Sequence, residues 1–290
     1  QRDQNKLFAV GDDWQSIYQF RCADIGVIYD FKKTFSYAKI SNLNQTYRFN
    51  RIIEKVTTNF IQKNPKQSKR QIKTDKKIEI FPFEIIEFNN TNQNDKIELI
   101  FKKVLKFEKE PKKVNILAMA RYNDPFKNIY DKLKSKDEYK DLKIDFNTIH
   151  SSKGTEAEYV IINDVSSGQN SIKKTFPSNM SDDPILELVL SNADDYLNAE
   201  ERRLFYVALT RAKKKIFITT RMKEWKWKKS YFVNEIENHY KTVKACPICS
   251  KNPNLDVKNS LIIKYGDVDA YLECEYCKYV EELKLDLVDV

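Results

Sequence analysis

The chain has 290 residues, of which 41% are hydrophobic and 32% charged, a balance typical of a globular protein with a sizeable core. No run reaches the roughly 18 apolar residues of a membrane span and no basic-then-apolar leader opens the chain, so we expect a cytoplasmic protein. The net charge of +9 favours a polyanionic partner, although abundant lysine with few glycines also fits nucleotide bias in the coding genome.

Strand-like and helix-like patterns alternate along the chain. In chain order, we expect strands at 7–10, 38–43, 78–88, 114–120, 144–149, 159–165 and 215–220, and helices at about 50–62, 95–107, 124–133, 198–214 and 230–240. Pro82 must interrupt its strand or place it at a sheet edge. The polar stretches 63–77 and 166–197 are expected as an exposed loop and an irregular insertion. This alternation predicts an α/β fold with a parallel sheet and crossover helices.

The stretch Asn198–Lys214 is the most informative helix pattern. Asn198 is a suitable N-cap, and Glu201 three residues later completes a capping-box pattern. The apolar stripe of this helix comprises Leu204, Val207 and Ala208. Arg211 follows Leu204 by seven residues and so falls on nearly the same, inward face. Because burial of an unpaired arginine is costly, we expect an anion beside Arg211, either a carboxylate of the fold or a bound phosphate.

Five cysteines are present, and four of them form two CxxC pairs near the C-terminus. This spacing predicts a tetrahedral zinc site whose ligands are Cys246, Cys249, Cys274 and Cys277. Alternating residues around Gly266-Asp267 predict a hairpin, so residues 243–290 are interpreted as a zinc ribbon, similar to the small zinc modules of DNA topoisomerases. The metal would stabilise a small core, and nearby lysines leave a DNA-binding role open. We expect Cys22 to be a buried, small apolar residue.

Four stretches are interpreted together, because each is predicted at the carboxyl end of a strand or on a helix beside one, where open α/β sheets bind ligands. They are VGDDWQSIYQFR (10–21), LNQTYR (43–48), TIHSSKGTEAEYV (148–160) and EERRLFYVALTRAKK (200–214). In this order they resemble the third to sixth motifs of superfamily 1 DNA helicases of the UvrD/Rep type, and GDDWQSIY most resembles the helicase IV branch. The resemblance covers about residues 7–220 and implies a RecA-like parallel sheet with flanking helices, the second motor domain of such an enzyme.

The resemblance also implies roles for individual residues at an ATP site between two RecA-like domains. Gln15 would sense the γ-phosphate or the attacking water, and Arg48 and Arg211 would be arginine fingers that stabilise charge during phosphoryl transfer. Tyr47 would stack on the adenine, and Glu156 would hydrogen-bond the ribose. The cofactor-binding residues implied in this way are Tyr47, Glu156 and Gly154. Taken alone, Gln15 would be interpreted as a surface polar residue and Tyr47 as a core aromatic.

Single-stranded DNA binding requires aromatic platforms for the bases and a basic groove for the backbone. By resemblance, the DNA-binding residues are Tyr18, Phe20, Arg121 and His150. Tyr18 and Phe20 would belong to the platform, and Arg121 and His150 would touch the strand or couple it to the ATP site. A lone histidine is more often an ordinary hydrogen-bonded polar residue. The neighbouring arginines of the last stretch, Arg202 and Arg203, are expected in structural pairs or domain contacts.

Two parts of such a motor are missing from the sequence: the phosphate-loop pattern GxxxxGK[ST] and the acidic DExx stretch that holds magnesium. We therefore expect residues 1–40 to be the end of a first RecA-like domain and residues 41–242 to be the second RecA-like domain. ATP with Mg would be held mainly by the missing N-terminal RecA-like half, supplied in cis or in trans. The chain alone is predicted not to hydrolyse ATP.

The leading hypothesis is the C-terminal part of an ATP-dependent DNA helicase that moves 3′ to 5′ and acts on single-stranded DNA or on DNA with a single-stranded tail. The alternative is a non-catalytic DNA-binding or partner protein from a split or truncated helicase gene. A nuclease-helicase subunit is a third reading, but no carboxylate cluster has nuclease-like spacing. An upstream reading frame encoding GxGKT and DExx would distinguish the first two hypotheses.

Overall fold

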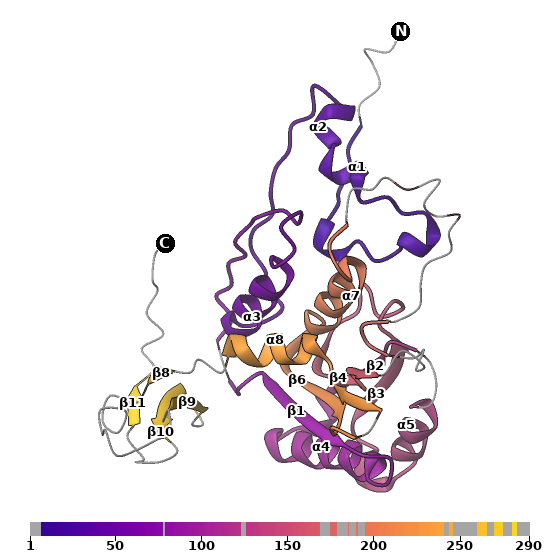
Figure 1. Cartoon of the computed structure of the whole chain (residues 1–290). Coiled ribbons are helices and arrows are strands. Elements are labelled where there is room, and N and C mark those ends of the chain that lie inside the picture. Colours follow the sequence, from indigo (N-terminus) through magenta and orange to yellow (C-terminus); the bar gives the residue numbers. More distant parts are fainter. Residues whose placement is uncertain are drawn as a thin grey trace.

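The computed structural model describes residues 7–77, 79–122, 126–168, 175–178, 185, 190, 195–224, 226–240, 244–245, 260–265, 270–274 and 280–282. A five-stranded sheet with the order β1-β6-β4-β2-β3 forms its centre (Figure 1). The strands are β1 (Phe83–Phe88), β2 (Asn115–Ala120), β3 (Lys143–Thr148), β4 (Ala157–Asn163) and β6 (Ala212–Arg221). All neighbouring pairs in this sheet are parallel, which confirms the predicted α/β class.

The central strands are nearly continuous apolar runs because both faces of the sheet are covered. The side chains from Tyr159 to Ile162 in β4 are all fully buried. β1 is an edge strand and starts only after Pro82, whose carbonyl accepts a hydrogen bond from the backbone N–H of Ile216 (2.7 Å). The expected strand 78–88 therefore loses its first residues, because proline has no N–H to donate to a ladder.

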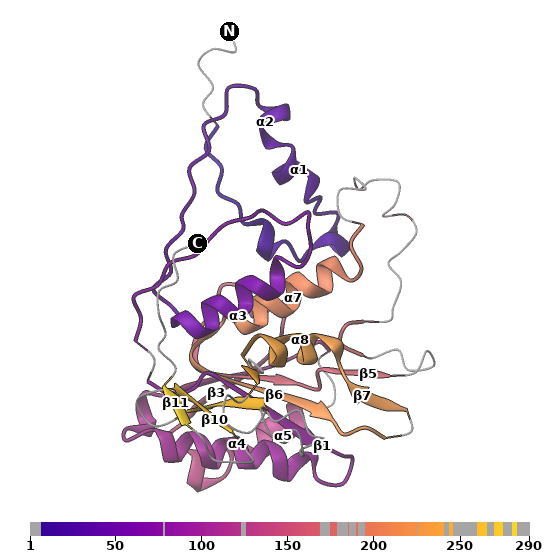
Figure 2. The same ribbon diagram turned by 60° about the vertical axis from the view of Figure 1, so that its left-hand side comes forward.

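Helices cover both faces of the sheet (Figures 1 and 2). One face packs against α4 (Gln93–Phe107) and α5 (Lys127–Lys134), and the other against α3 (Arg51–Ile61), α7 (Ala199–Leu209) and α8 (Tyr231–Tyr240). α4 buries residues at helical spacing, namely Ile97, Ile100, Phe101 and Val104. Asn50 is the N-cap of α3, and its side chain accepts hydrogen bonds from the N–H groups of Ile52 and Ile53, both at 3.1 Å.

The helix at 198–214 differs from the prediction at both ends. Asn198 has φ 54°, a left-handed conformation, and its Nδ2 donates to the Tyr231 hydroxyl (2.9 Å) instead of capping the helix. Glu201 bonds elsewhere, so the expected capping box is wrong. α7 ends at Leu209, and Arg211 lies in the turn before β6. Arg211 is buried at 2% exposure as expected, but by this turn and not by a position on the helix face.

The N-terminal segment contains short helical elements. These are η1 (Asp13–Gln15), η2 (Gln19–Arg21), α1 (Gly26–Tyr29) and α2 (Phe31–Thr34). The expected strands at 7–10 and 38–43 are wrong: both segments are irregular, and Leu7, Phe8 and Val10 are exposed. An apolar run becomes a strand only when another strand pairs with it, and no described strand pairs with either segment.

Cys22 is exposed, so the expectation of a buried cysteine is also wrong. It ends η2 in a left-handed conformation (φ 59°), in a surface turn where its side chain has no core to enter. The remaining short elements of the described chain are η3 (Pro111–Lys113), η4 (Asp137–Tyr139) and the antiparallel pair β5 (Ser166–Gly168) and β7 (Trp227–Lys229). None of the described helices has the length and apolar character that crossing a bilayer requires.

The C-terminal strands form a four-stranded antiparallel sheet with the order β11-β10-β9-β8. They are β8 (Lys244–Ala245), β9 (Ser260–Tyr265), β10 (Ala270–Cys274) and β11 (Val280–Glu282). β9 pairs with β10 from Tyr265↔Ala270 to Leu261↔Cys274, which confirms the predicted hairpin. Cys246, Cys249 and Cys277 lie outside the described residues, and Cys274 is described only as the last residue of β10.

Candidate functional site

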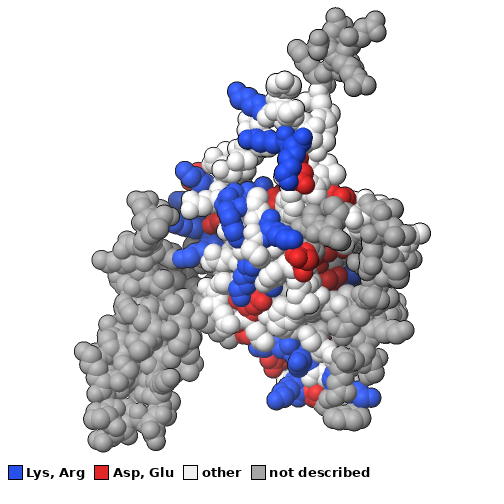
Figure 3. Space-filling model, turned by 45° about the horizontal axis from the view of Figure 1, so that its top comes forward, with Lys and Arg blue, Asp and Glu red and all other residues white. Residues whose placement is uncertain are grey.

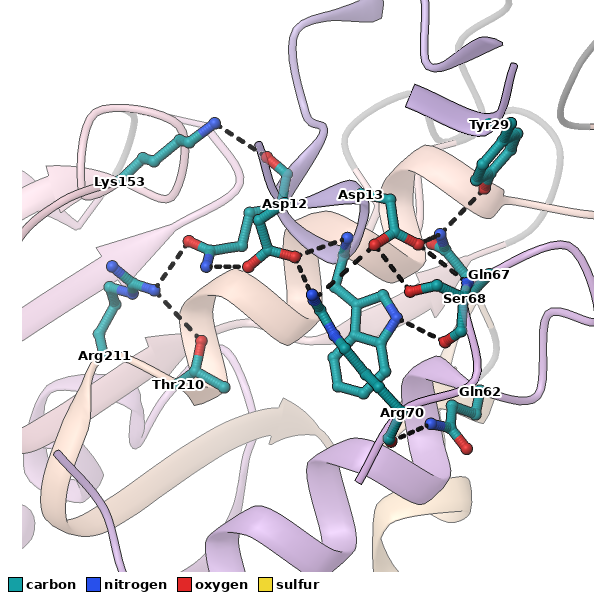
Figure 4. Close-up of polar contacts among 12 residues, drawn as sticks. Asp12, Asp13, Tyr29, Gln62, Gln67, Ser68, Arg70, Lys153, Thr210 and Arg211 are labelled. Atoms are coloured by element: carbon teal, nitrogen blue, oxygen red, sulfur yellow. Dashed lines mark hydrogen bonds and ion pairs between the residues drawn. The ribbon is translucent and has the colours of Figure 1, made fainter. Parts of the chain in front are cut away.

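The stretch 10–21 is anchored on α7 by an aromatic contact. Trp14 is fully buried, and its ring meets Tyr206 edge-on with centroids 5.5 Å apart. Arg203 of α7 donates from Nε to the Ser16 carbonyl (2.6 Å), and Lys153 donates from Nζ to the Gln15 carbonyl (2.9 Å). These contacts bring segments far apart in sequence to one place, because residues 15 and 16 bond both α7 and the loop that precedes β4. Figure 4 shows Asp12, Lys153 and Arg211 at this place.

Arg211 is held by neutral groups. Its Nη2 donates to Gln15 Oε1 and to Thr210 Oγ1, both at 3.3 Å, and its Nε donates to the Val207 carbonyl (2.9 Å). Burial lowers the pKa of Arg211 to about 10, and the positive charge of Arg48 acts in the same direction. No carboxylate forms an ion pair with Arg211 among the described residues, so the expected alternative of a fold carboxylate is not seen there.

Arg48 reaches the same turn from the end of the second stretch. Its Nη1 donates to the Thr210 carbonyl (3.2 Å), so Thr210 bonds both Arg48 and Arg211. Its Nε bonds Glu156 Oε2 (3.0 Å), while Lys213 Nζ bonds Glu156 Oε1 (2.8 Å). Hydrogen bonds from Lys213 and Arg48 lower the pKa of Glu156 to about 2. The three predicted residues Arg48, Glu156 and Arg211 therefore form one cluster.

Two further predicted residues are close in sequence to members of this cluster. Tyr47 is 79% exposed, so it is not the core aromatic that its sequence alone would indicate. Gly154 has φ 92°, a conformation that residues with a Cβ rarely adopt, and a Cβ added there would meet no atom within 4 Å. An exposed ring and an open backbone position thus lie in sequence beside Arg48 and Glu156.

The position of this cluster corrects the sequence interpretation. Glu156 directly precedes β4 and Arg211 directly precedes β6, so both lie at the amino ends of parallel strands and not at the carboxyl ends. Arg121 follows β2 and His150 follows β3, so these residues lie at the carboxyl ends. The predicted residues therefore divide into two groups. The loop 149–156, which runs from the end of β3 to the start of β4, connects them.

The second group is an aromatic cluster with cations above its rings. Phe20 meets His150 edge-on at 5.2 Å between centroids, and Tyr18 lies 6.1 Å from Phe20 and 6.2 Å from His150. The Arg21 guanidinium lies 5.6 Å from the Tyr18 ring and 5.4 Å from the Phe20 ring, and Lys153 Nζ lies 5.1 Å from Tyr18. Burial and the charges of Arg121 and Arg21 lower the pKa of His150 to about 4, so this imidazole is neutral near pH 7.

Arg121 is not a free cation. It forms an ion pair with Glu201, in which Oε1 lies 2.9 Å from Nε and 2.8 Å from Nη2, and Oε2 lies 3.2 Å from Nε. Glu201 Oε2 also accepts from the Ser178 N–H (3.0 Å), and Glu200 Oε1 accepts from the Gln19 N–H (2.8 Å). The acidic start of α7 thus holds the elements that carry the aromatic cluster, while its other end leads to Arg211.

Comparison with known proteins identifies the family. Residues 132–223 match the UvrD-like helicase C-terminal domain, and residues 1–36 match the UvrD/REP helicase N-terminal domain. DNA helicase IV from Escherichia coli (strain K12) is 35% identical over 221 residues, which are 75% of this chain and 30% of that protein. The chain belongs to the UvrD-like helicases.

Two other relatives of this UvrD-like chain are more partial. The protein named "Probable DNA helicase II homolog" of Mycoplasma capricolum subsp. capricolum (strain California kid) is 38% identical over 73 residues, which are 25% of the chain and 10% of that protein. A solved structure, the C-terminal domain of a possible DNA helicase from Lactobacillus plantarum WCFS1, aligns with 12% identity and a TM-score of 0.38. The alignment covers 66% of this chain and 94% of the chain in that structure. The chain thus spans less than a third of the length of the two curated relatives.

Sequence reasoning missed several residues of the UvrD-like site. The sequence indicates a capping role for Glu201, although its carboxylate binds Arg121, and no sequence pattern marks Thr210. Arg70 lies in a stretch expected as a solvated loop, yet it pairs with Asp12, two residues after the strand-like run 7–10. Nothing local marks such a residue, because its partner lies 58 positions away. By contrast, Arg202 pairs with Glu235 (2.6 Å), as expected for a structural arginine.

Proposed function

We propose that this UvrD-like chain is the C-terminal part of an ATP-dependent DNA helicase, in which Arg48 and Arg211 stabilise charge on the γ-phosphate of ATP. The observation that carries the proposal is the Arg211 guanidinium. It is 2% exposed, is bonded to neutral groups in the described part of the chain, and shares Thr210 with Arg48. A buried cation without a bonded carboxylate is stabilised when an anion binds beside it.

The donor set fits a nucleoside triphosphate. Tyr47 offers an exposed ring to the adenine, and Glu156 offers a carboxylate to the ribose. Gln15 bonds Arg211 and so lies where a polar amide contacts the γ-phosphate or the attacking water. Bound ATP supplies the phosphoryl group whose transfer to water releases free energy. Gly154 leaves open space at the edge of this site.

The aromatic cluster is proposed as the surface for single-stranded DNA. Tyr18 and Phe20 provide faces on which bases stack, and stacking is tolerant of sequence. Arg21 lies over both rings, and the same N-terminal segment carries the exposed lysines Lys32, Lys33 and Lys39. Figure 3 shows Lys and Arg side chains spread over the upper part of the described face. Their charge attracts the DNA backbone, and by family the movement along it is 3′ to 5′.

The proposed domain division is the one that the four motif stretches indicate. Residues 1–40 complete a first RecA-like domain, residues 41–242 form the second, and residues 243–290 form a separate module. The phosphate loop and the magnesium ligands then belong to an N-terminal RecA-like half supplied in cis or in trans. The match of residues 1–36 to the UvrD/REP N-terminal domain supports this division.

The test compares the chain alone with the chain joined to a RecA-like half that carries GxGKT and DExx. DNA-stimulated ATP hydrolysis is expected only from the joined protein. In that protein, Arg211→Ala should lower kcat by about 10³-fold and affect ATP binding far less, because an arginine finger acts mainly on the transition state. Arg51→Ala, which removes an exposed arginine at the start of α3, is the matched control and should change neither quantity.

Two outcomes would count against this function. Equal losses in turnover and ATP binding for Arg211→Ala would contradict the finger role. If the joined protein binds single-stranded DNA but never hydrolyses ATP, the alternative of a non-catalytic DNA-binding or partner protein is correct. Hydrolysis by the chain alone would contradict the proposed division of the ATP site.

We also propose that Cys246, Cys249, Cys274 and Cys277 bind one zinc ion. The register of the C-terminal sheet supports this. β8 and β10 both pair with β9 in antiparallel fashion, with Ala245 opposite Ser260 and Cys274 opposite Leu261. β8 and β10 therefore run in the same direction, and both end beside the start of β9. In sequence, the first CxxC pair follows β8 and the second begins with Cys274 at the end of β10, and four thiols are a donor set that zinc prefers.

A further inference from the structure

The loop that follows α3 binds the segment 12–15 through hydrogen bonds. Asp13 is 4% exposed, and its carboxylate accepts hydrogen bonds from the Ser68 N–H (2.9 Å), Ser68 Oγ (2.8 Å) and Gln67 Nε2 (3.1 Å). The Trp14 indole N–H donates to the Ser68 carbonyl (3.1 Å). A charged residue this deeply buried needs such donors to offset its lost hydration. Figure 4 shows Asp13 beside Gln67 and Ser68. The loop thus fixes the backbone at residues 13 and 14, directly before Gln15.

Arg70 lies farther along this loop and pairs with the carboxylate of Asp12. Its Nη2 forms an ion pair with Asp12 Oδ1, and its guanidinium lies 4.1 Å from the centre of the Trp14 ring. The Arg70 carbonyl is itself held by Gln62 Nε2 of the cap of α3 (2.7 Å). A planar guanidinium stacked on an indole and paired with a carboxylate has little freedom to turn.

Asp12 in turn fixes the orientation of the Gln15 side chain. Asp12 Oδ1 accepts from the Trp14 N–H (3.1 Å), and Oδ2 accepts from Gln15 Nε2 (2.5 Å). Because a carboxylate only accepts hydrogen bonds, the amide must turn its NH₂ group toward Asp12. Its carbonyl Oε1 then faces Arg211 Nη2 at 3.3 Å. The reversed amide would place two N–H donors against each other.

We propose that Arg70 is a positioning residue for Gln15, acting through Asp12 so that the Gln15 carbonyl faces Arg211 and the attacking water. Arg70 belongs to none of the four motif stretches and touches neither Gln15 nor Arg211 in the described contacts. The inference rests on the proposed function for its effect on catalysis. The link from Arg70 to Asp12 to Gln15 is a property of this chain alone and is measured separately.

The first experiment uses the isolated chain labelled with ¹⁵N at glutamine side chains. The Gln15 amide signal is identified by its loss in Gln15→Ala. Arg70→Met should shift this signal and speed the exchange of its protons with water, because Asp12 no longer holds the NH₂ group. Arg70→Lys should restore part of the protection. Lys69→Met, which removes the neighbouring exposed cation, should leave the signal unchanged.

The second experiment uses the joined protein of the preceding section. Arg70→Met should lower kcat by about 10²-fold, the size of effect that a misplaced catalytic group produces, while KM for ATP changes little. The double variant Gln15→Ala/Arg70→Met should be no slower than Gln15→Ala alone, because Arg70 acts through Gln15. Gln67→Ala loosens the same loop at Asp13 without touching Arg70 or Asp12, and tests for a merely structural effect.

The outcomes separate the two proposals. An unchanged Gln15 signal in Arg70→Met overturns the positioning role whatever the ATPase shows. Additive losses in the double variant, or an equal effect of Gln67→Ala, overturn it as well. If the joined protein has no ATPase, the proposed function fails, and the signal of the isolated chain alone decides whether Arg70 orders Gln15.

Discussion

Arg48 Nε bonds Glu156 Oε2 at 3.0 Å and so connects two residues that are 108 positions apart. The same carboxylate bonds Lys213, and the side chains of Arg48 and Glu156 are 28% and 44% exposed. Ion pairs in contact with water stabilise little and exchange partners readily. This pair therefore holds Arg48 beside Arg211 only weakly, and in the proposed function a phosphate of ATP replaces Glu156 as its partner.

The first prediction concerns how pH changes the contribution of the Arg48–Glu156 pair to the free energy of unfolding. The pKa of Glu156 is lowered from 4.5 to about 2, so its contribution is fully present above about pH 4.5 and is lost as the pH falls toward 2. Glu156→Gln should lower the free energy of unfolding by at most about 1 kcal/mol near pH 7, because the pair is partly exposed. Urea unfolding followed by tryptophan fluorescence measures this difference.

The difference between wild type and Glu156→Gln should shrink between about pH 4.5 and 2. Glu224→Gln, at an exposed residue outside the cluster, serves as the control and should match wild type throughout. A difference that grows on acidification would mean that Glu156 is not held as a charged partner of Arg48 and Lys213.

A second prediction concerns the buried pair between α7 and α8. Arg202 is 2% exposed and bonds Glu235 through Nη1 (2.6 Å) and Nη2 (3.1 Å). Glu235→Ala leaves a buried cation without its carboxylate and should lower the free energy of unfolding by about 3–5 kcal/mol. Replacing both residues with methionine should cost much less, because no charge then remains buried. Thermal and urea unfolding measure both variants.

The matched control is Glu79→Ala, which removes a carboxylate that is 60% exposed and pairs with Lys214. It should lower the free energy of unfolding by about 0–1 kcal/mol. If Glu235→Ala costs no more than this control, Arg202 finds another partner or water, and its pairing with Glu235 is not what stabilises the contact of α7 with α8.

Much of the fold could be predicted because its signals are local. β2 and β4 are apolar runs that need cover on both faces, and α4 repeats its buried residues at helical spacing. The strand at 7–10 failed because pairing depends on a partner elsewhere. Asn198 failed as a cap because a hydroxyl of α8 binds its side chain. Local propensity cannot register a competing partner that only the tertiary fold brings near.

The candidate site shows the same limit. The motif stretches predicted Arg48, Glu156 and Arg211, which the fold brings into one cluster at Thr210. The expectation that Glu156 lies at the carboxyl end of a strand is wrong, because the short loop 149–156 returns to the start of β4 without a helix. Arg70 carries no sequence signal, since its loop is polar and its function depends on Asp12. Sequence motifs therefore identify the residues of the cluster, whereas only the three-dimensional structure reveals a residue such as Arg70 that positions one of them.

A third prediction concerns the protonation of His150, one of two histidines in the chain. Burial first, and then the charges of Arg121 and Arg21, lower its pKa from 6.5 to about 4. The unfolded chain therefore takes up this proton at a higher pH than the folded chain, and stability falls as the pH drops from about 6.5 to 4. Two-dimensional NMR should show the His150 ring titrating near pH 4.

His150→Asn should remove this part of the pH dependence of unfolding, whereas His239→Asn should keep it. DNA affinity, measured by anisotropy of a labelled single strand, should show no step between about pH 8 and 6, because His150 stays neutral there. A His150 signal that titrates near 6.5 would show that the aromatic cluster is open to water and carries a charge when it meets DNA.

The last prediction concerns zinc and the five thiols. If Cys246, Cys249, Cys274 and Cys277 hold zinc, the native protein should contain one zinc ion per chain, and only the exposed Cys22 should react rapidly with a thiol reagent. Chelation should release the metal, make all five thiols reactive and unfold the C-terminal module, since metal binding supplies its folding free energy. Cys22→Ser should remove the rapid phase and leave the zinc content unchanged, while Cys274→Ser should lower it. Five reactive thiols and no bound metal in the native protein would show that the two CxxC pairs do not form a zinc site.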